Sequence, residues 1–134
     1  MIFRSATAQS KTFHSHGEEK IARALEEHGI PYSYEHPLAV VDDGKVRIWY
    51  PDFQLPEYGI LIEYFGMLND RNYLAGMSKK EAVYEANGLA AVLLTPDLLD
   101  EDWPASMLDR IEGILCERLT GFHDARARFL GPTR

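Results

Sequence analysis

The pattern of apolar and polar positions first indicates an amphipathic helix that starts after Ser15. Its apolar residues recur at helical spacing: Ile21, Ala22 and Leu25. Ser15 and Glu18 have the spacing of a capping box, in which a hydroxyl and a carboxylate bond to free backbone N–H groups of the first turn. Gly29 favours the end of the helix, because glycine readily takes the left-handed conformation found there. The pattern therefore predicts a helix between Ser15 and Gly29.

Three strand-like runs follow this helix. Residues 30–35 and 46–53 alternate in character, whereas residues 60–65 are almost continuously apolar, which is typical of a strand in the middle of a sheet. Turn-forming residues separate the runs at 42–45 and 56–59. Because only a short turn joins the last two runs, we expect them to pair as antiparallel neighbours.

The rest of the chain predicts a helix, a buried strand and a final helix. The first of these helices should cover about residues 72–87, with Gly88 as its terminator, and residues 89–94 should form a short buried strand. The final helix opens at Trp103-Pro104 and has these apolar positions: Met107, Leu108, Ile111, Ile114, Leu115 and Leu119. The order α-β-β-β-α-β-α predicts an α/β fold with helices flanking a mixed central sheet. The final helix would complete the core or form an interface.

Length and composition are those of one globular domain. The chain has 134 residues, of which 46% are hydrophobic, so it can build a packed core. We expect a single domain over residues 1–134, with a core at about 15–94, a helical extension at about 104–120 and a basic tail at each end. Residues 1–16 lack the apolar segment of a signal peptide, and no run is long enough to span a bilayer. We therefore expect no membrane association and a cytoplasmic location.

The charge of the chain is unevenly distributed. The net charge is -7, yet residues 1–17 carry two bases and no acid, and residues 121–134 carry three arginines against one acid. The acids therefore gather in the middle of the chain. An acidic region repels phosphate unless a cation intervenes. The alternative is an acidic surface that is simply solvated.

Asp52 and Glu63 each lie inside an apolar, strand-like run. A carboxylate in such surroundings is costly unless something compensates it. If the two runs pair around the turn at 56–59, the side chains are cross-strand neighbours roughly 5–8 Å apart, close enough to share one cation. Oxygen-only ligands favour Mg²⁺, with Mn²⁺ as a substitute, over zinc. The alternative is an aspartate at a strand end and a glutamate on an exposed strand face.

Lys80 is expected to face the same place. Tyr73, Met77, Lys80 and Tyr84 fall on one face of the predicted helix, and Lys79 is turned away from it. A lysine among aromatic residues on an inward face needs an anionic partner, which the two carboxylates or a phosphate would supply. The alternative is a lysine at the edge of the stripe whose amine reaches solvent.

Glu18 is open to two interpretations. It completes the capping box, and that alone explains a glutamate at this position. It also shares the apolar stripe of its helix, which directs it toward the sheet. It therefore serves the cap alone, or the cap and the active site together.

These motifs, in this order, resemble the PD-(D/E)xK nuclease superfamily, in particular a branch found in helicase-associated and in phage or mobile-element nucleases. The resemblance spans about Ser15 to Leu94 and rests on five blocks: Glu18-Glu19-Lys20-Ile21-Ala22, Gly29-Ile30-Pro31-Tyr32-Ser33-Tyr34-Glu35, Tyr50-Pro51-Asp52-Phe53, Ile62-Glu63-Tyr64-Phe65-Gly66, and Tyr73, Lys80 and Tyr84 on one helix. It implies a restriction-endonuclease-like fold with an α-β-β-β-α-β core.

The resemblance implies a metal-dependent deoxyribonuclease that hydrolyses DNA phosphodiester bonds in repair, recombination, restriction or processing of mobile-element or phage DNA. Asp52 and Glu63 would bind Mg²⁺, with the Tyr64 backbone carbonyl as a further ligand. Lys80 would orient the attacking water or stabilise developing charge, and Glu18 would bind a second metal or position a water. The candidate substrate-binding residues are Arg71, Tyr73 and Tyr84. Small nucleases of this type often act as dimers, so the expected partners are DNA and a second copy of the chain.

One position departs from the superfamily pattern. The superfamily usually has a lysine two residues after the second acid, on the same strand, and this chain has Phe65 there. Nuclease activity therefore requires Lys80 to reach the site from the helix. Without that, the alternative is a non-catalytic nucleic-acid-binding module that keeps the fold. A third hypothesis is a metal-independent domain whose acidic centre binds a basic protein.

Overall fold

A computed structural model describes residues 12–67, 70–98 and 102–131 of the chain. The elements in chain order are α1 (His16–Glu27), β1 (Ser33–Tyr34), β2 (Leu38–Asp42), β3 (Lys45–Trp49), β4 (Phe53–Leu55), β5 (Ile60–Tyr64), α2 (Arg71–Ala86), β6 (Ala90–Leu94), the short 3-10 helix η1 (Pro96–Leu98) and α3 (Trp103–Leu130). The described residues therefore form a mixed α/β structure.

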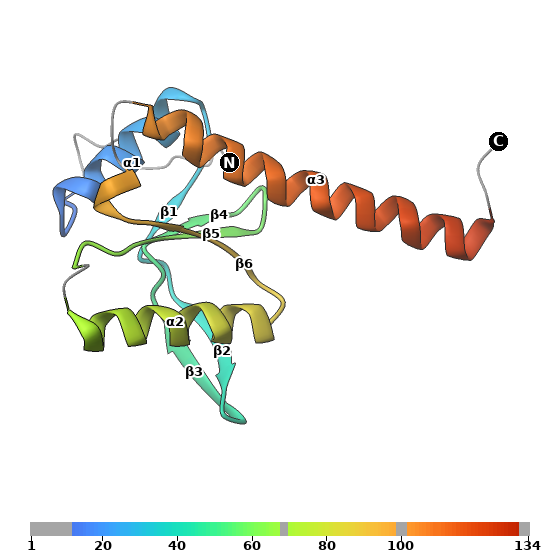
Figure 1. The fold of residues 1–134 in the computed structure, drawn as a ribbon, viewed down its shortest axis with the longest axis horizontal. Coiled ribbons are helices and arrows are strands. Elements are labelled where there is room, and N and C mark those ends of the chain that lie inside the picture. Colours follow the sequence, from blue (N-terminus) through green and yellow to red (C-terminus); the bar gives the residue numbers. More distant parts are fainter. Residues whose placement is uncertain (1–11, 68–69, 99–101, 132–134) are drawn as a thin grey trace.

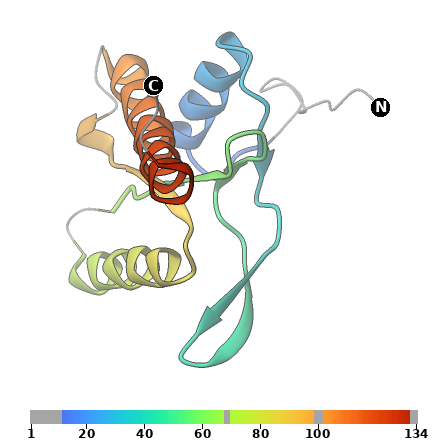
Figure 2. The ribbon, with the colours of Figure 1, turned by 90° about the vertical axis from the view of Figure 1, so that its right-hand side faces the viewer.

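The main sheet has the strand order β1-β4-β5-β6. β4 pairs antiparallel with β1 and with β5, and β6 pairs parallel with β5. Helices α1 and α3 cover one face of this sheet and α2 covers the other (Figure 1, Figure 2). The predicted α/β class with a mixed sheet is confirmed, and so is the antiparallel pairing of the two runs around residues 56–59.

Strand β5 separates two apolar cores because its side chains alternate between the faces of the sheet. Ile60 and Ile62 point into the larger core, which α1 and α3 close. Leu61 points into a smaller core on the α2 side, which also contains Val40 from the β2–β3 hairpin. The same alternation assigns Glu63 to the α2 face and Tyr64 to the α1 face.

Only one of the two hydrogen bonds of the expected capping box forms at the start of α1. The Ser15 hydroxyl accepts a hydrogen bond from the Glu18 backbone N–H at 3.1 Å. The Glu18 carboxylate instead accepts a hydrogen bond from the Tyr34 hydroxyl. No returning bond to Ser15 occurs among the described residues, so the carboxylate half of the prediction is wrong. Gly29 follows the end of the helix with a φ of 65°, as predicted.

The strands after α1 differ from the prediction in number and length. Only Ser33 and Tyr34 of the first run are a strand, and the second run is divided into β3 and β4. Pro51 lies at the division, where its missing N–H favours a break in the ladder. Strand β2 was not predicted, although the apolar run before the 42–45 turn was a usable signal. β2 and β3 form a separate hairpin.

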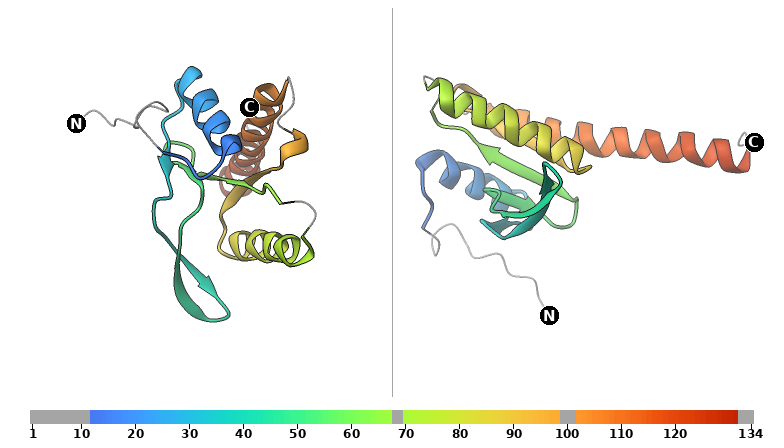
Figure 3. Two further views of the ribbon diagram at one scale, coloured as in Figure 1. Left: turned by 90° about the vertical axis from the view of Figure 1, so that its left-hand side faces the viewer. Right: turned by 90° about the horizontal axis from the view of Figure 1, so that it is seen from below.

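Helix α3 is longer than predicted. The apolar pattern supported a helix to about residue 120, with a basic tail beyond it, but the helix continues to Leu130. Four residues of high helix propensity, Ala125 to Arg128, lie in this segment, and the helix stops before Gly131. Its second half projects away from the rest of the molecule (Figure 3). The predicted bounds of α2 and β6 differ from the structure by a single residue at their ends.

Gly17→Ala is expected to destabilise the protein, although alanine is normally the better helix residue. An added Cβ at Gly17 would lie 2.3 Å from Cζ of Tyr64, so the ring beside the candidate site would have to move. We expect a loss of about 1–3 kcal/mol in the free energy of unfolding. Gly76→Ala in α2 is the matched control, because nothing lies within 4 Å of its added Cβ. Urea unfolding should show a lower free energy of unfolding for Gly17→Ala and an unchanged or higher one for Gly76→Ala. A stabilised Gly17→Ala would contradict the close packing of Tyr64 against Gly17.

Candidate active site

The register of β4 and β5 brings Asp52 and Glu63 together. Phe53 pairs with Ile62, so the next position along each strand places Asp52 opposite Glu63. The Asp52 backbone N–H donates to Oε1 of Glu63 at 2.8 Å. The Tyr64 backbone N–H donates to Oδ2 of Asp52 at 2.7 Å. Each carboxylate is therefore held by the backbone of the other's segment, and the predicted proximity is confirmed.

Glu63 is buried, with 1% of its surface exposed, and α2 supplies its partners. Nζ of Lys80 lies 2.8 Å from Oε2 of Glu63, and the Tyr84 hydroxyl donates to the same oxygen at 3.3 Å. Lys80 and Tyr84 are four residues apart, so they lie on one side of the helix. A buried carboxylate is tolerated when it is paired and hydrogen-bonded in this way. The predicted inward position of Lys80 is confirmed.

Phe65 occupies the strand position next to this ion pair. Its ring lies edge-on to Tyr73, with 5.8 Å between the ring centroids, and Nζ of Lys80 is 5.9 Å from the Phe65 centroid. Because Glu63 and Phe65 are two apart on an extended strand, they face the same side. The Lys80 amine thus reaches Glu63 from α2. Phe65 occupies the position, two residues after Glu63, where the superfamily usually has its lysine.

Asp52 has an unusual protonation equilibrium for an aspartate. Its burial and, to a smaller extent, the negative charge of Glu63 raise the pKa of Asp52 to about 7. The Tyr64 N–H and the charge of Lys80 act in the opposite direction. Two neighbouring carboxylates in a desolvated place disfavour full ionisation. A cation bound between them would remove this disadvantage.

Glu18 reaches the site from α1. It is 8% exposed and is held by the Tyr34 hydroxyl, which itself accepts the His14 backbone N–H at 3.1 Å. Its charge is among the causes that raise the pKa of Asp52. Of the two interpretations of Glu18, the one that includes the site is favoured. Sequence reasoning missed Tyr34, although the aromatic alternation of residues 30–35 was a signal for it.

The donor set partly fits a divalent metal. Asp52 and Glu63 offer hard carboxylate oxygens, which suit Mg²⁺, and the second oxygen of Asp52 accepts no hydrogen bond from any described residue. Within the described ranges, however, no group of three or more His, Cys, Asp or Glu side chains is arranged to hold a metal. Glu18 therefore does not complete a three-carboxylate cage. A metal here would take its remaining ligands from backbone oxygen, water or substrate.

The three candidate substrate-binding residues have different environments. Arg71 is exposed at the start of α2. The half-buried Tyr73 accepts the Gly66 N–H through its hydroxyl at 3.2 Å. Tyr84 is 1% exposed and packs edge-on against Trp49, with 5.6 Å between centroids. Tyr84 is therefore covered and bonded to Glu63, and its contact with substrate stays a prediction.

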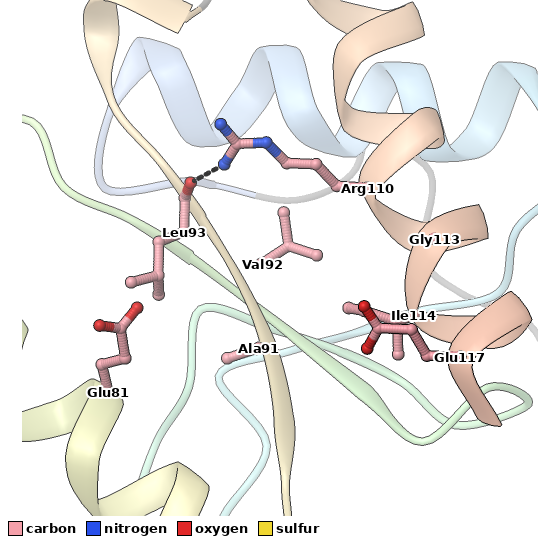
Figure 4. Close-up of a pocket in the computed structure, with 8 residues that line it drawn as sticks. All are labelled: Glu81, Ala91, Val92, Leu93, Arg110, Gly113, Ile114 and Glu117. Atoms are coloured by element: carbon pink, nitrogen blue, oxygen red, sulfur yellow. Dashed lines mark hydrogen bonds between the residues drawn. The ribbon is translucent and has the colours of Figure 1, made fainter. Parts of the chain in front are cut away.

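A separate hollow of about 310 Å³ follows the free edge of β6 between α2 and α3. It is lined by Glu81, Ala91, Val92, Leu93, Arg110, Gly113, Ile114 and Glu117 (Figure 4). Arg110 of α3 donates to the Leu93 carbonyl at 2.8 Å, which occupies an otherwise unpaired group of the edge strand. None of the predicted site residues lines this hollow, so it is distinct from the carboxylate cluster.

Comparison with known proteins assigns no family. No family model, curated protein sequence or solved structure matches the chain. None of the helices in the described part of the chain is long and apolar enough to cross a membrane. The function has to be inferred from the geometry of the site and from its chemistry.

Proposed function

We propose that this protein is a metal-dependent deoxyribonuclease with a restriction-endonuclease-like core and a PD-(D/E)xK type of site. The observation that carries the proposal is the cluster of Asp52, Glu63 and Lys80, in which the amine of Lys80 lies 2.8 Å from Oε2 of Glu63. Two carboxylates that could hold a metal ion and one amine that could stabilise developing charge are brought together here, a combination that suits metal-assisted phosphodiester hydrolysis. DNA repair, recombination, restriction and mobile-element or phage DNA processing are the processes such an activity would serve.

The position of Lys80 favours a catalytic nuclease over a non-catalytic binding module. The superfamily resemblance expects a lysine on the strand, where Phe65 stands. Since Lys80 contacts Glu63 from α2, an amine is available at the carboxylates despite this departure. Its side chain is 42% exposed, so it can also meet a ligand that arrives from solvent.

The residues of this chain would divide the work as follows. Asp52 and Glu63 would hold Mg²⁺, or Mn²⁺ in its place, together with the Tyr64 carbonyl. The bound metal would supply Lewis-acid stabilisation of the phosphate and a more acidic attacking water. Lys80 would orient that water or stabilise the charge that develops on the phosphate, and Glu18 would position a second cation or a water. The net charge of the chain is -7, which repels the phosphates of DNA. A cation bound at the carboxylates would make the local charge more positive and allow a phosphate to approach.

A non-catalytic nucleic-acid-binding module is the second candidate function. Phe65 favours it, because the strand position of the usual lysine is buried and apolar. In that case Lys80 would serve only to neutralise Glu63. The protein would then bind DNA without cleaving it.

The test is a cleavage assay with supercoiled, single-stranded and branched DNA. Wild-type protein should cleave at least one substrate with Mg²⁺ or Mn²⁺ and none with EDTA. Glu63→Gln, purified in parallel, controls for a contaminating nuclease, and Glu57→Gln on the exposed β4–β5 turn controls for the substitution itself. Absence of metal-dependent cleavage, or equal cleavage by Glu63→Gln, would sink the proposal. DNA binding without cleavage would favour the module instead.

A further inference from the structure

Strand β6 forms one edge of the main sheet, and most of its outer backbone groups are unpaired. The Leu94 carbonyl accepts the Phe65 N–H at 2.8 Å, so the backbone groups of Leu94 face β5. Because these groups alternate in direction along a strand, the N–H and C=O groups of Ala91 and Leu93 face outward. Arg110 occupies the Leu93 carbonyl. The Leu93 N–H and both groups of Ala91 have no partner among the described residues.

The hollow of about 310 Å³ beside this edge leaves room for another chain. Helices α2 and α3 flank β6 on opposite faces of the sheet, and no described element lies beyond the strand (Figure 2, Figure 3). Gly113 keeps the α3 wall of the hollow open, because nothing lies within 4 Å of a Cβ added there. The unpaired groups of Ala91 and Leu93 therefore border an accessible space.

Unpaired groups at a strand edge require an extended chain as their partner. An added strand offers N–H and C=O groups at the spacing of the edge, whereas a helix has its own groups paired internally. In this mode of recognition, main-chain hydrogen bonds supply affinity and the side chains of alternate residues supply specificity. Since Arg110 already holds the Leu93 carbonyl, the ladder would end there and the paired stretch would be short.

The charged side chains around the hollow favour a basic peptide. Glu81 from α2 and Glu117 from α3 stand on its two sides (Figure 4). Both are exposed, and neither forms an ion pair with any described residue. Arg110 is the one base among the described lining residues, and its guanidinium is turned to the Leu93 carbonyl. Two acidic side chains are therefore available to basic side chains of an added strand.

The same charges argue against nucleic acid and against a second copy of this chain in the hollow. Phosphates would meet Glu81 and Glu117 without an intervening cation. A second copy that paired through its own β6 would bring an equally acidic rim to the hollow, which like-charge repulsion disfavours. The charges thus favour a segment of a different protein.

We propose that the free edge of β6, between α2 and α3, is a docking site for an extended basic segment of a partner protein. The segment pairs with the backbone of Ala91 and Leu93 as an added strand, and its Lys or Arg side chains meet Glu81 and Glu117. This inference does not depend on nuclease activity, because it uses no residue of the carboxylate cluster.

Selection from a random peptide library displayed on phage tests the site without assuming a sequence. Immobilised wild-type protein should select peptides rich in Lys and Arg that bind Gly113→Leu at least about tenfold more weakly. This substitution fills the hollow and replaces a glycine within a helix, so the variant should fold, which circular dichroism verifies. Gly121→Leu, where an added Cβ also meets nothing within 4 Å, lies outside the hollow and should bind normally. A library that yields no peptide sensitive to Gly113→Leu overturns the proposal.

A scan of single N-methylations along a selected peptide tests the strand pairing. Methyl groups at alternate positions should weaken binding at least about tenfold, because only every second N–H faces β6. Bound peptide should also protect the Ala91 and Leu93 amides from hydrogen exchange in NMR spectra. Uniform effects along the peptide, or unprotected amides, would exclude an added strand.

Neutral substitutions test the charge of the segment. Glu81→Gln/Glu117→Gln should weaken binding of a selected peptide about fivefold or more at low salt, and less at high salt. Glu57→Gln on the β4–β5 turn should leave the affinity unchanged. Selection of acidic peptides, or an unchanged affinity of the double variant, would overturn the assignment to a basic segment.

Discussion

Asp52→Asn is expected to raise the stability of the metal-free protein at pH 8 and to abolish metal-dependent cleavage. The wild type at this pH must keep the half-buried Asp52 ionised next to Glu63, although partial burial and Glu63 raise its pKa to about 7. Asparagine is neutral and can still accept the Tyr64 N–H through its side-chain oxygen. The substitution therefore removes an electrostatic cost while it removes a proposed metal ligand.

The pH dependence of this gain follows from proton linkage. The folded protein binds a proton at Asp52 more tightly than the unfolded chain does, because the pKa is about 7 when folded against 3.8 in the reference state. Wild-type stability should therefore fall as pH rises from about 4 to about 7 and stay low above that. The advantage of Asp52→Asn should be absent at pH 4 and complete at pH 8. Its size should be on the order of 1–4 kcal/mol.

Thermal unfolding in EDTA at a series of pH values measures this difference. We expect an increase in Tm of at least about 3 °C at pH 8, together with a loss of cleavage of at least about 100-fold in Mg²⁺. Asp124→Asn, exposed on the projecting half of α3, should change neither quantity. A destabilised Asp52→Asn at pH 8 would show that the carboxylate is favourable as an anion without metal.

Lys80→Ala is expected to impair both stability and cleavage. Glu63 is 1% exposed and would lose its nearest cation, leaving a buried carboxylate beside Asp52. Because Lys80 itself is 42% exposed, solvent screens part of this loss. We therefore expect a destabilisation of roughly 1–2 kcal/mol and a decrease in cleavage rate of about 100-fold or more.

Lys79→Ala is the matched control for Lys80→Ala. Lys79 precedes Lys80 in α2 but pairs with Asp42 at 3.6 Å and is 67% exposed, so its loss should cost at most about 0.5 kcal/mol. Urea unfolding and single-turnover cleavage distinguish the two variants. Equal effects at both positions would mean that the amine at Glu63 has no special role.

Moving the amine from Lys80 to position 65 tests whether it takes part in catalysis or only neutralises Glu63. Phe65 faces the same side of β5 as Glu63, so Lys80→Ala/Phe65→Lys would return an amine to the carboxylates from the strand position. Partial recovery of cleavage over Lys80→Ala would support a chemical role for the amine. Recovery of stability without cleavage would leave Lys80 as a partner of Glu63 only.

Local patterns predicted several elements because their signals are contained in short segments. The hydroxyl cap at Ser15, the end of α1 before Gly29, and helix α2 all follow from residues within a few positions of one another. The division of residues 46–53 into two strands was not predictable in this way. The alternating pattern was continuous. Although the missing N–H of Pro51 favours a break, the new partner of the chain after it, Glu63 on another strand, which accepts the Asp52 N–H, is a tertiary contact.

The carboxylate pair was predictable because two apolar runs and one short turn limit the possible registers of a hairpin. Lys80 was predictable as well, since helical periodicity assigns its face without knowledge of the sheet. The roles of Glu18 and Tyr84 were not predictable to the same degree. A helical stripe shows that a side chain is inward, but only the packing of α2 on β5 shows that Tyr84 is covered and bonded to Glu63.

The sequence by itself determined the mixed α/β class, the pairing of Asp52 with Glu63 and the inward direction of Lys80, because periodicity and short turns encode all three locally. Only the tertiary structure decided that the Glu18 carboxylate accepts the Tyr34 hydroxyl instead of capping α1. It also decided that α3 extends beyond the elements that cover its first half, so that Phe122 and Phe129 are exposed. Both outcomes depend on where elements distant in the sequence end relative to one another, and no local pattern carries that information.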